Sequence, residues 1–160
     1  MRRAFTLVEL LVVIGLMAVL MSVVLPNFLT PVSRSSFAST LEILTSNIRS
    51  QQLKSIQGSS TGSLGPVYRG IRFNTDNYVL FSGQTYSVSD PANTEVDLDP
   101  ALRISFINLP GSEIIFAPGS GAVSNFVAPA ISGDLTLVDV QSGLSTVIVI
   151  NQYGVVTQIY

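Results

Sequence analysis

An apolar run near the amino terminus limits what this chain can become more than any other feature. Between residues 10 and 25 the only polar side chain is Ser22, and Gly15 is the only other interruption. Counted from Phe5, the apolar segment has about the 20 residues that a membrane-spanning helix needs. One acid, Glu9, nevertheless lies near its start. Any interpretation of the segment must therefore also explain this carboxylate.

The charges that flank the segment predict which of its ends stays in the cytoplasm. Arg2 and Arg3 precede it, and the next basic residue is Arg34. An excess of Lys and Arg on one side marks the cytoplasmic side of a membrane helix. We therefore expect a single-pass orientation in the cytoplasmic membrane, with the amino terminus inside and the carboxy-terminal part outside.

Three interpretations of the segment compete. A secretory signal peptide would share the basic start and the apolar core, but the stretch SVVLPNF at residues 22–28 offers no small-x-small cleavage site. An uncleaved signal anchor explains the length and the orientation, but it leaves Glu9 unexplained. In the third interpretation the acid has a partner, because a carboxylate in the hydrocarbon region costs roughly 2.5–3.5 kcal/mol or more when it is unpaired.

A cut before Phe5 would create that partner. No basic side chain lies at a similar depth, whereas cleavage between Ala4 and Phe5 leaves a positively charged α-amine on Phe5. Glu9 follows four residues later and lies on the same helical face. Its carboxylate can therefore pair with the amine of its own chain or with that of a neighbouring chain.

The stretch RAFTLVELLVVIGLMAVLMSVVLPNF, residues 3–28, resembles the processing signal and amino-terminal helix of type IV pilins and type II secretion pseudopilins. In that family a prepilin peptidase removes a short basic leader before an aromatic residue and methylates the new amine. The resemblance implies cleavage between Ala4 and Phe5, N-methylation of Phe5 and an assembly role for Glu9. Ala4 stands where the family usually has Gly, and it also has the small side chain that the peptidase needs. Pro26 matches the family's proline late in the apolar segment.

An amphipathic pattern beyond the apolar segment predicts that the helix continues. Four apolar residues recur at spacings of four, three and four, namely Phe37, Leu41, Leu44 and Ile48. This spacing places them on one face of a helix. We predict one helix from about residue 5 to about residue 56, bent near Pro26, because an interior proline costs about 3 kcal/mol unless the geometry accommodates it. The apolar face should pack on the domain that follows.

After residue 66 the pattern changes to short strands rich in β-branched and aromatic residues. The predicted strands are 67–73, 77–83, 84–88, 102–108, 112–118, 134–140, 145–150 and 154–160. Turn signals rich in Gly, Pro, Asn and Asp separate them. We therefore expect a mostly antiparallel head made of two packed or partly barrelled sheets, and an α+β fold class.

These patterns divide the chain into a helical part and a β-rich part, joined by a loop. The predicted parts are a cleaved leader (1–4), a transmembrane and filament-core helix (5–28), its amphipathic continuation (29–57), a loop (58–66) and the globular head (67–160). By resemblance, this α+β arrangement of a long bent helix and a β-rich head is pilin-like.

The head is also similar in order and rhythm to the GspH/FimT group of minor pseudopilins and minor pilins. Three stretches carry this similarity, namely GIRFNTDNYVLFSG, IIFAPGSGAV and TVIVINQYGVVTQ. Phe116, Pro118 and Gly119 stand at the turn that this group shows midway, and Gly154 stands at the last turn.

Composition excludes most enzyme chemistry. The chain has no Cys and no His, which removes thiolate catalysis, zinc–thiolate sites and the commonest general base. Lys54 is the only lysine and lacks a Ser-x-x-Lys motif, and nothing in the sequence requires Glu113 and Asp134 to be neighbours. We therefore expect neither an enzyme nor a cofactor.

Two further clusters of charged residues are weak candidates for binding sites, one for calcium and one for phosphate. The acidic stretch at residues 90–100 contains Asp97 and Asp99, candidates for calcium, but its spacing fits no known loop motif and a solvated loop is preferred. Arg69, Arg72 and Arg103 give only a weak phosphate-binding signal within a net charge of −2, so nucleic acid is not expected as a partner.

The resemblance implies a structural function as a minor pilin or pseudopilin, assembled into a type II secretion pseudopilus or a type IV pilus. The implied partners are the prepilin peptidase and methyltransferase, other pilin or pseudopilin subunits, and the assembly platform of the inner membrane. Two alternatives stay open. The chain can be a major pilin subunit, or an uncleaved single-pass protein that presents a binding head at the membrane.

Overall fold

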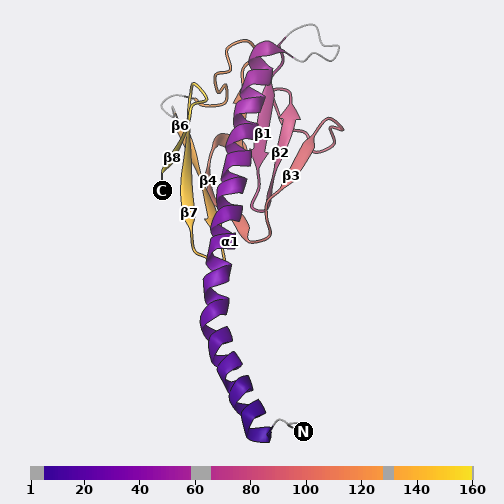
Figure 1. Cartoon of the computed structure of the whole chain (residues 1–160). Coiled ribbons are helices and arrows are strands. Elements are labelled where there is room, and N and C mark those ends of the chain that lie inside the picture. The colour runs from indigo at the N-terminus through magenta and orange to yellow at the C-terminus, as the bar shows by residue number, and fades with distance from the viewer. Residues whose placement is uncertain (1–5, 59–65, 128–131, 160) are drawn as a thin grey trace. The chain divides into compact units, whose positions relative to one another are not determined.

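The computed structural model describes residues 6–58, 66–127 and 132–159 (Figure 1). For residues 23–34, 158 and 159 the description covers the backbone alone. The chain divides into two compact units, residues 1–36 and residues 37–160, and each is considered by itself below. A helix followed by antiparallel sheets confirms the predicted α+β fold class.

The long helix α1 runs from Leu7 to Gln57 and has 51 residues. It starts and ends close to the predicted limits, and it continues through Pro26 and Pro31 without a break. The bend expected near Pro26 remains a prediction.

The part of α1 that belongs to the first unit was expected to span a membrane. Among the residues that the structure describes, no helix is long and apolar enough to cross one. The expected membrane span at residues 5–28 is therefore not confirmed, and neither is the pilin-like form of the fold.

The second unit contains two four-stranded sheets in which every neighbouring pair is antiparallel. The first sheet has the order β3 (Thr94–Asp97), β2 (Asn77–Ser82), β1 (Arg69–Phe73), β5 (Glu113–Phe116), and the 3₁₀ turn η1 (Pro110–Ser112) precedes β5. The second sheet has the order β4 (Leu102–Asn108), β6 (Ser132–Asp139), β7 (Ser145–Asn151), β8 (Val156–Ile159). Two sheets were expected, and they are confirmed.

The helix face predicted from the spacing of apolar residues packs on both sheets. Its four apolar residues are between 0% and 7% exposed and join one core cluster: Phe37, Leu41, Leu44 and Ile48. The first sheet contributes residues such as Ile71 and Phe73, and the second contributes residues such as Leu135 and Ile148. Figure 1 shows this half of α1 lying along the strands. Each fully buried large side chain of this kind stabilises the fold by about 1.5–3 kcal/mol.

The strand prediction was wrong in one region. Residues 84–88 form a loop, in which the ring of Tyr86 packs edge-on against Phe81 with centroids 5.6 Å apart. The strand β3 forms instead at Thr94–Asp97, inside the stretch interpreted as a solvated loop. Its one apolar residue, Val96, packs against the core, while the residues before and after it, Glu95 and Asp97, stay exposed. A single apolar side chain that reaches the core is thus enough to place this strand, although its other side chains are polar.

Candidate functional site

The amino-terminal end of α1 is capped by its own sequence. Thr6 lies just before the helix, and its side-chain oxygen Oγ1 accepts a hydrogen bond from the backbone N–H of Glu9 at 3.3 Å. The carbonyl of Thr6 also accepts the N–H of Leu10 at 3.2 Å. Thr followed three residues later by Glu is the spacing of a capping box. The T-x-x-E signal for this cap is visible in the sequence at residues 6–9, and in the structure the Thr6 half of the box is formed.

The carboxylate of Glu9 has no hydrogen bond or ion pair to any of the described residues. Its side chain is exposed and lies in the first turn of α1, where the helix dipole favours a negative charge by about 0.3–1 kcal/mol. Within the described part of the chain, the site thus holds one anion without a partner at the start of a long helix.

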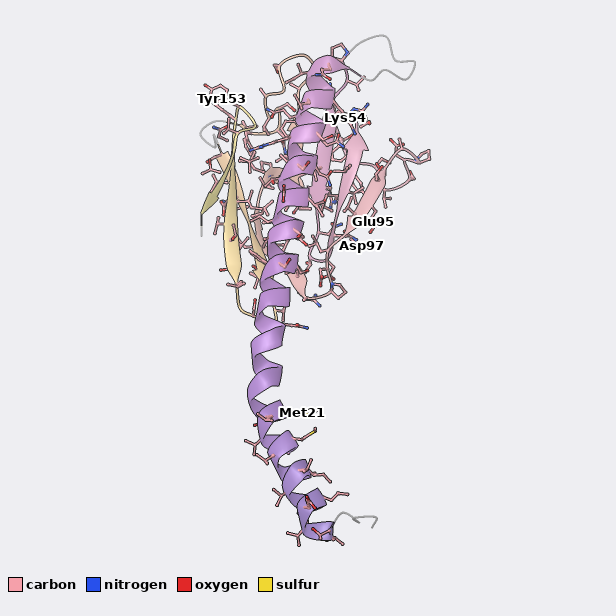
Figure 2. All side chains as sticks on the ribbon, viewed as in Figure 1. Met21, Lys54, Glu95, Asp97 and Tyr153 are labelled. Atoms are coloured by element: carbon pink, nitrogen blue, oxygen red, sulfur yellow. The ribbon has the colours of Figure 1, made fainter. Side chains whose placement is uncertain are left out.

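The helix surface around this anion is apolar on every side. Large side chains between residues 7 and 21 are between 46% and 80% exposed, and Figure 2 shows them pointing in all directions near the labelled Met21. Ser22, the polar residue that follows this stretch, donates its hydroxyl to the carbonyl of Val19 at 2.8 Å and so needs no further partner. A helix that is apolar all round requires apolar surroundings from outside its own unit. Among residues 7–22, Glu9 is therefore the one side chain whose polar group lacks a partner in the described part of the chain and would need one from outside it.

The other predicted residues of this site lie outside the description. Ala4 and Phe5 are not among the described residues, so the cleavage between them and the methylation of Phe5 remain predictions. The pairing of the Phe5 amine with Glu9 likewise stays a prediction, since it needs both ends of the pair.

The acids suggested for calcium take part in turns or face solvent. Asp99 accepts the backbone N–H of Ala101 at 2.9 Å, and Asp90 accepts that of Ala92 at the same distance. Asp97 is exposed at the end of β3. Within the described ranges, no group of three or more His, Cys, Asp or Glu side chains lies close enough together to hold a metal ion.

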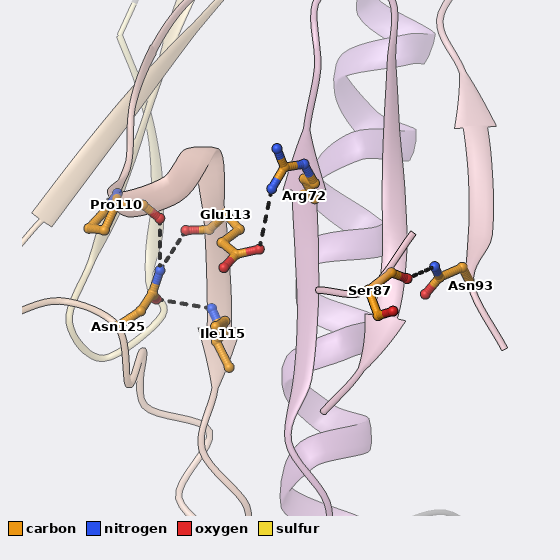
Figure 3. Close-up of polar contacts among 7 residues, drawn as sticks. All are labelled: Arg72, Ser87, Asn93, Pro110, Glu113, Ile115 and Asn125. Carbon is orange, nitrogen blue, oxygen red and sulfur yellow. Dashed lines mark hydrogen bonds and ion pairs between the residues drawn. The ribbon is translucent and has the colours of Figure 1, made fainter. Parts of the chain in front are cut away.

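The arginines considered for phosphate binding contact partners within the head. Arg103 forms an ion pair with Asp76 at 2.8 Å, and Arg69 donates to the hydroxyl of Ser82. Arg72 lies 3.9 Å from the carboxylate of Glu113 (Figure 3). Each guanidinium thus has a neighbour of its own chain.

The two carboxylates considered for acid–base chemistry have separate partners. Burial raises the pKa of Glu113, and the charge of Arg72 partly opposes this by lowering it. Asp134 instead accepts a hydrogen bond from the side chain of Asn108 at 2.8 Å. Because Glu113 lies near Arg72 and Asp134 is hydrogen-bonded to Asn108, the surroundings of the two carboxylates give no sign of a shared acid–base pair.

Comparison with known proteins identifies the amino-terminal segment alone. Residues 1–25 match the model of the prokaryotic N-terminal methylation motif. No curated protein and no solved structure matches the chain. The motif covers the apolar segment up to Leu25 and includes Ala4, Phe5 and Glu9. It supports a type IV pilin-like precursor and suggests a structural subunit rather than an enzyme.

Proposed function

We propose that this chain is the precursor of a minor pilin or pseudopilin, a structural subunit of a type II secretion pseudopilus or a type IV pilus. The observation that carries the proposal is the carboxylate of Glu9, without a partner among the described residues, on a helical segment (residues 7–21) that is otherwise apolar and exposed. This carboxylate lies inside the segment that matches the methylation motif.

Processing gives the carboxylate its partner. A prepilin peptidase cuts between Ala4 and Phe5, which removes Arg2 and Arg3 and exposes the amine of Phe5. Methylation of this amine leaves it basic and therefore cationic. Glu9 then pairs with the amine of its own chain or of a neighbouring subunit. The pair offsets the roughly 2.5–3.5 kcal/mol that an unpaired carboxylate would cost in an apolar environment.

Assembly follows from this pairing. Before the cut, the apolar segment associates the precursor with the cytoplasmic membrane in a single pass, with the amino terminus inside and the head outside. After the cut, the segments of neighbouring subunits pack together in the core of a filament. The partners are the prepilin peptidase and methyltransferase, other pilin or pseudopilin subunits, and the inner-membrane assembly platform. The weaker similarity to the GspH/FimT group favours a minor subunit near the tip.

The amino terminus of the chain, isolated from cells that contain a prepilin peptidase, tests the processing step. We expect a mature chain that starts at Phe5 and carries one methyl group on its amine, as measured by mass spectrometry. An intact Met1 without methylation would favour the uncleaved membrane anchor instead. Copy number in isolated filaments separates a minor subunit, which is scarce, from a major pilin.

Three variants separate the charge of Glu9 from the polarity of its side chain and from the cap of Thr6. Glu9→Gln keeps a polar side chain of the same size but removes the charge, whereas Glu9→Ala removes both, and neither removes the backbone N–H that Thr6 accepts. We expect both variants to enter filaments at least about tenfold less than the wild type, because tenfold corresponds to only 1.4 kcal/mol. Thr6→Ala weakens the cap by about 1 kcal/mol and should still assemble. Normal assembly of Glu9→Gln together with loss in Glu9→Ala would show that a polar side chain, not its charge, is needed.

A further inference from the structure

The outer face of the second half of α1 carries two cations without a partner in the described part of the chain. Arg49 and Lys54 are both exposed, and neither forms an ion pair or a hydrogen bond with a described residue. This differs from the arginines of the strands, each of which has a neighbour in the head. The helix face thus presents charge that the head itself does not use.

Two grooves run along this part of α1. One has a volume of about 500 Å³ and follows α1 from Glu42 to Gln57. The other, of about 310 Å³, lies between α1 and the turn that joins β7 to β8, and it includes Val155. The grooves share Arg49 and Leu53.

The region where the grooves meet is apolar at its centre. Leu53, which lines both grooves, is 53% exposed, and Val155, which lines the second, is 55% exposed. Tyr153 lies outside both grooves, in the same turn as Val155, and is 66% exposed. Figure 2 shows the labelled Lys54 and Tyr153 at the end of the head where α1 ends. We call this surface the basic face and define it as Arg49, Leu53, Lys54, Tyr153 and Val155. It combines an apolar centre with two positive charges.

A surface of opposite charge lies on another part of the same chain. The strand β3 is the outermost strand of its sheet, so one of its edges has no neighbour among the strands that the structure describes. Glu95 and Asp97 are exposed on it, as Figure 2 shows, and they define what we call the acidic edge. Asp97 has no partner among the described residues, and only one carboxylate oxygen of Glu95 accepts a hydrogen bond, from the side chain of Asn77.

The charges of the two surfaces are placed differently. Glu95 and Asp97 are two residues apart, so their side chains leave the same side of the strand about 6.8 Å from each other. Arg49 and Lys54 are five residues apart, which separates them by about 7.5 Å along the helix axis and by about 140° around it. The two bases therefore flank the face of α1 that carries Leu53, and a strand laid over Leu53 lies between them.

We propose that the basic face of one chain binds the acidic edge of a second copy of the same chain. The occupant is a second copy because both complementary surfaces belong to this chain and lie on different elements. A contact between two different surfaces is heterologous, and it repeats in one direction if it does not close into a ring. It needs only two adjacent copies, so it suits a short cluster at a tip as well as a longer filament. The inference rests on the proposed role as an assembling subunit.

The contact is weak for an isolated pair of chains. Exposed ion pairs contribute little individually and are screened by salt, so the charges mainly set register and orientation. Attraction also comes from covering the apolar centre. Such a contact becomes effective where another interaction already holds the chains side by side, because their effective concentration is then high.

Cross-linking between full-length chains in detergent micelles tests the contact. The chain has no cysteine, so single introduced thiols are unambiguous. Ser50→Cys places a thiol in the groove of the basic face. Asn77→Cys places one on β2 opposite Asp97, on the side of the sheet from which Glu95 projects, and both variants leave the four charges in place. We expect a disulfide-linked dimer when the two variants are mixed, at least about tenfold above a mixture of Ser50→Cys with the exposed control Val140→Cys.

Charge reversal then tests the pairing itself. Glu95→Lys with Asp97→Lys should abolish the cross-link, and adding Arg49→Glu with Lys54→Glu in the same chains should restore it. Restoration also rules out misfolding as the cause of the loss. Absence of a cross-link above the control, its persistence after the first reversal, or its failure to return after the second would each overturn the proposal. The amino terminus is read separately, so a cross-linked chain with an intact Met1 would sink the proposed processing and leave this contact standing.

Discussion

Replacing Asn125 by Ala should destabilise the head by about 2–4 kcal/mol. Its side-chain oxygen accepts the backbone N–H of Ile115 at 3.1 Å, and its side-chain nitrogen donates to the carbonyls of Glu113 at 2.7 Å and Pro110 at 3.3 Å (Figure 3). Together with the backbone N–H of Ser124, which donates to the carbonyl of Ile115 at 2.7 Å, Asn125 thus takes the place of a neighbouring strand along the outer edge of β5. The magnitude combines about 1 kcal/mol for each good hydrogen bond with the cost of leaving the amide of buried Ile115 unsatisfied.

Urea unfolding of the full-length chain in detergent micelles, followed by the near-ultraviolet signal of its tyrosines, measures this loss. Hydrogen exchange at the amide of Ile115 should accelerate in the same variant. Asn93→Ala is a matched control, because Asn93 donates one hydrogen bond, to Ser87 at 2.7 Å, in an exposed loop that Figure 3 also shows. It should cost no more than about 1 kcal/mol.

Asn125→Asp adds a test of direction. The carboxylate can still accept the N–H of Ile115, but it cannot donate and it faces two carbonyl oxygens. We therefore expect a loss at neutral pH that partly recovers in acid, when protonation restores one donor. A loss below about 0.5 kcal/mol for Asn125→Ala, or one equal to that of Asn93→Ala, would refute the idea that this side chain closes the edge of β5.

Three further predictions concern single side chains of the head. Gly154→Ala should cost about 2–3 kcal/mol in urea unfolding, because φ is +75° there and the new Cβ would meet the side-chain amide of Gln52. Burial raises the pKa of Tyr78, so one tyrosine should ionise late in an alkaline absorbance titration, and Tyr78→Phe should remove that step and cost about 1 kcal/mol through the lost bond from Asn47 at 2.7 Å. A hydrogen bond from a neighbouring serine hydroxyl lowers the pKa of Asp139, so its stabilisation is present above the ordinary value of 3.8 and is lost as the pH falls below it. Asp139→Asn should flatten that acid limb of the stability curve.

The helix and the strands that carry an obvious apolar alternation follow from the sequence. The stripe from Phe37 to Ile48 predicts both the helix and the face that it buries, because side chains three and four residues apart share a helix face. The alternation at residues 134–140 and 145–150 likewise predicts β6 and β7, in which Leu135 and Ile148 are fully buried. In each of these segments the local period and the buried surface agree.

The elements that depend on distant contacts could not be predicted in this way. The stretch 84–88 has aromatic and β-branched residues, but it stays a loop in which Tyr86 packs on Phe81 and lies 5.0 Å beneath the guanidinium of Arg72. β3 has mostly polar residues and forms because β2 offers it an edge, with Val96 opposite Tyr78. The order of the strands and the closure of β5 by Asn125 depend on which segments meet, and no local pattern contains that information.

The cap of Thr6 sharpens the question of why Glu9 is an acid. Thr6 accepts the backbone N–H of Glu9, which other residues would also supply, so the cap does not require a charge. The helix dipole adds about 0.3–1 kcal/mol in favour of a carboxylate when the helix end is exposed. This gain is smaller than the roughly 2.5–3.5 kcal/mol that the same carboxylate costs in apolar surroundings without a partner. A charge at Glu9 is therefore favourable in apolar surroundings only if a cation reaches it, and the proposed cleavage before Phe5 would supply that cation as the new amine.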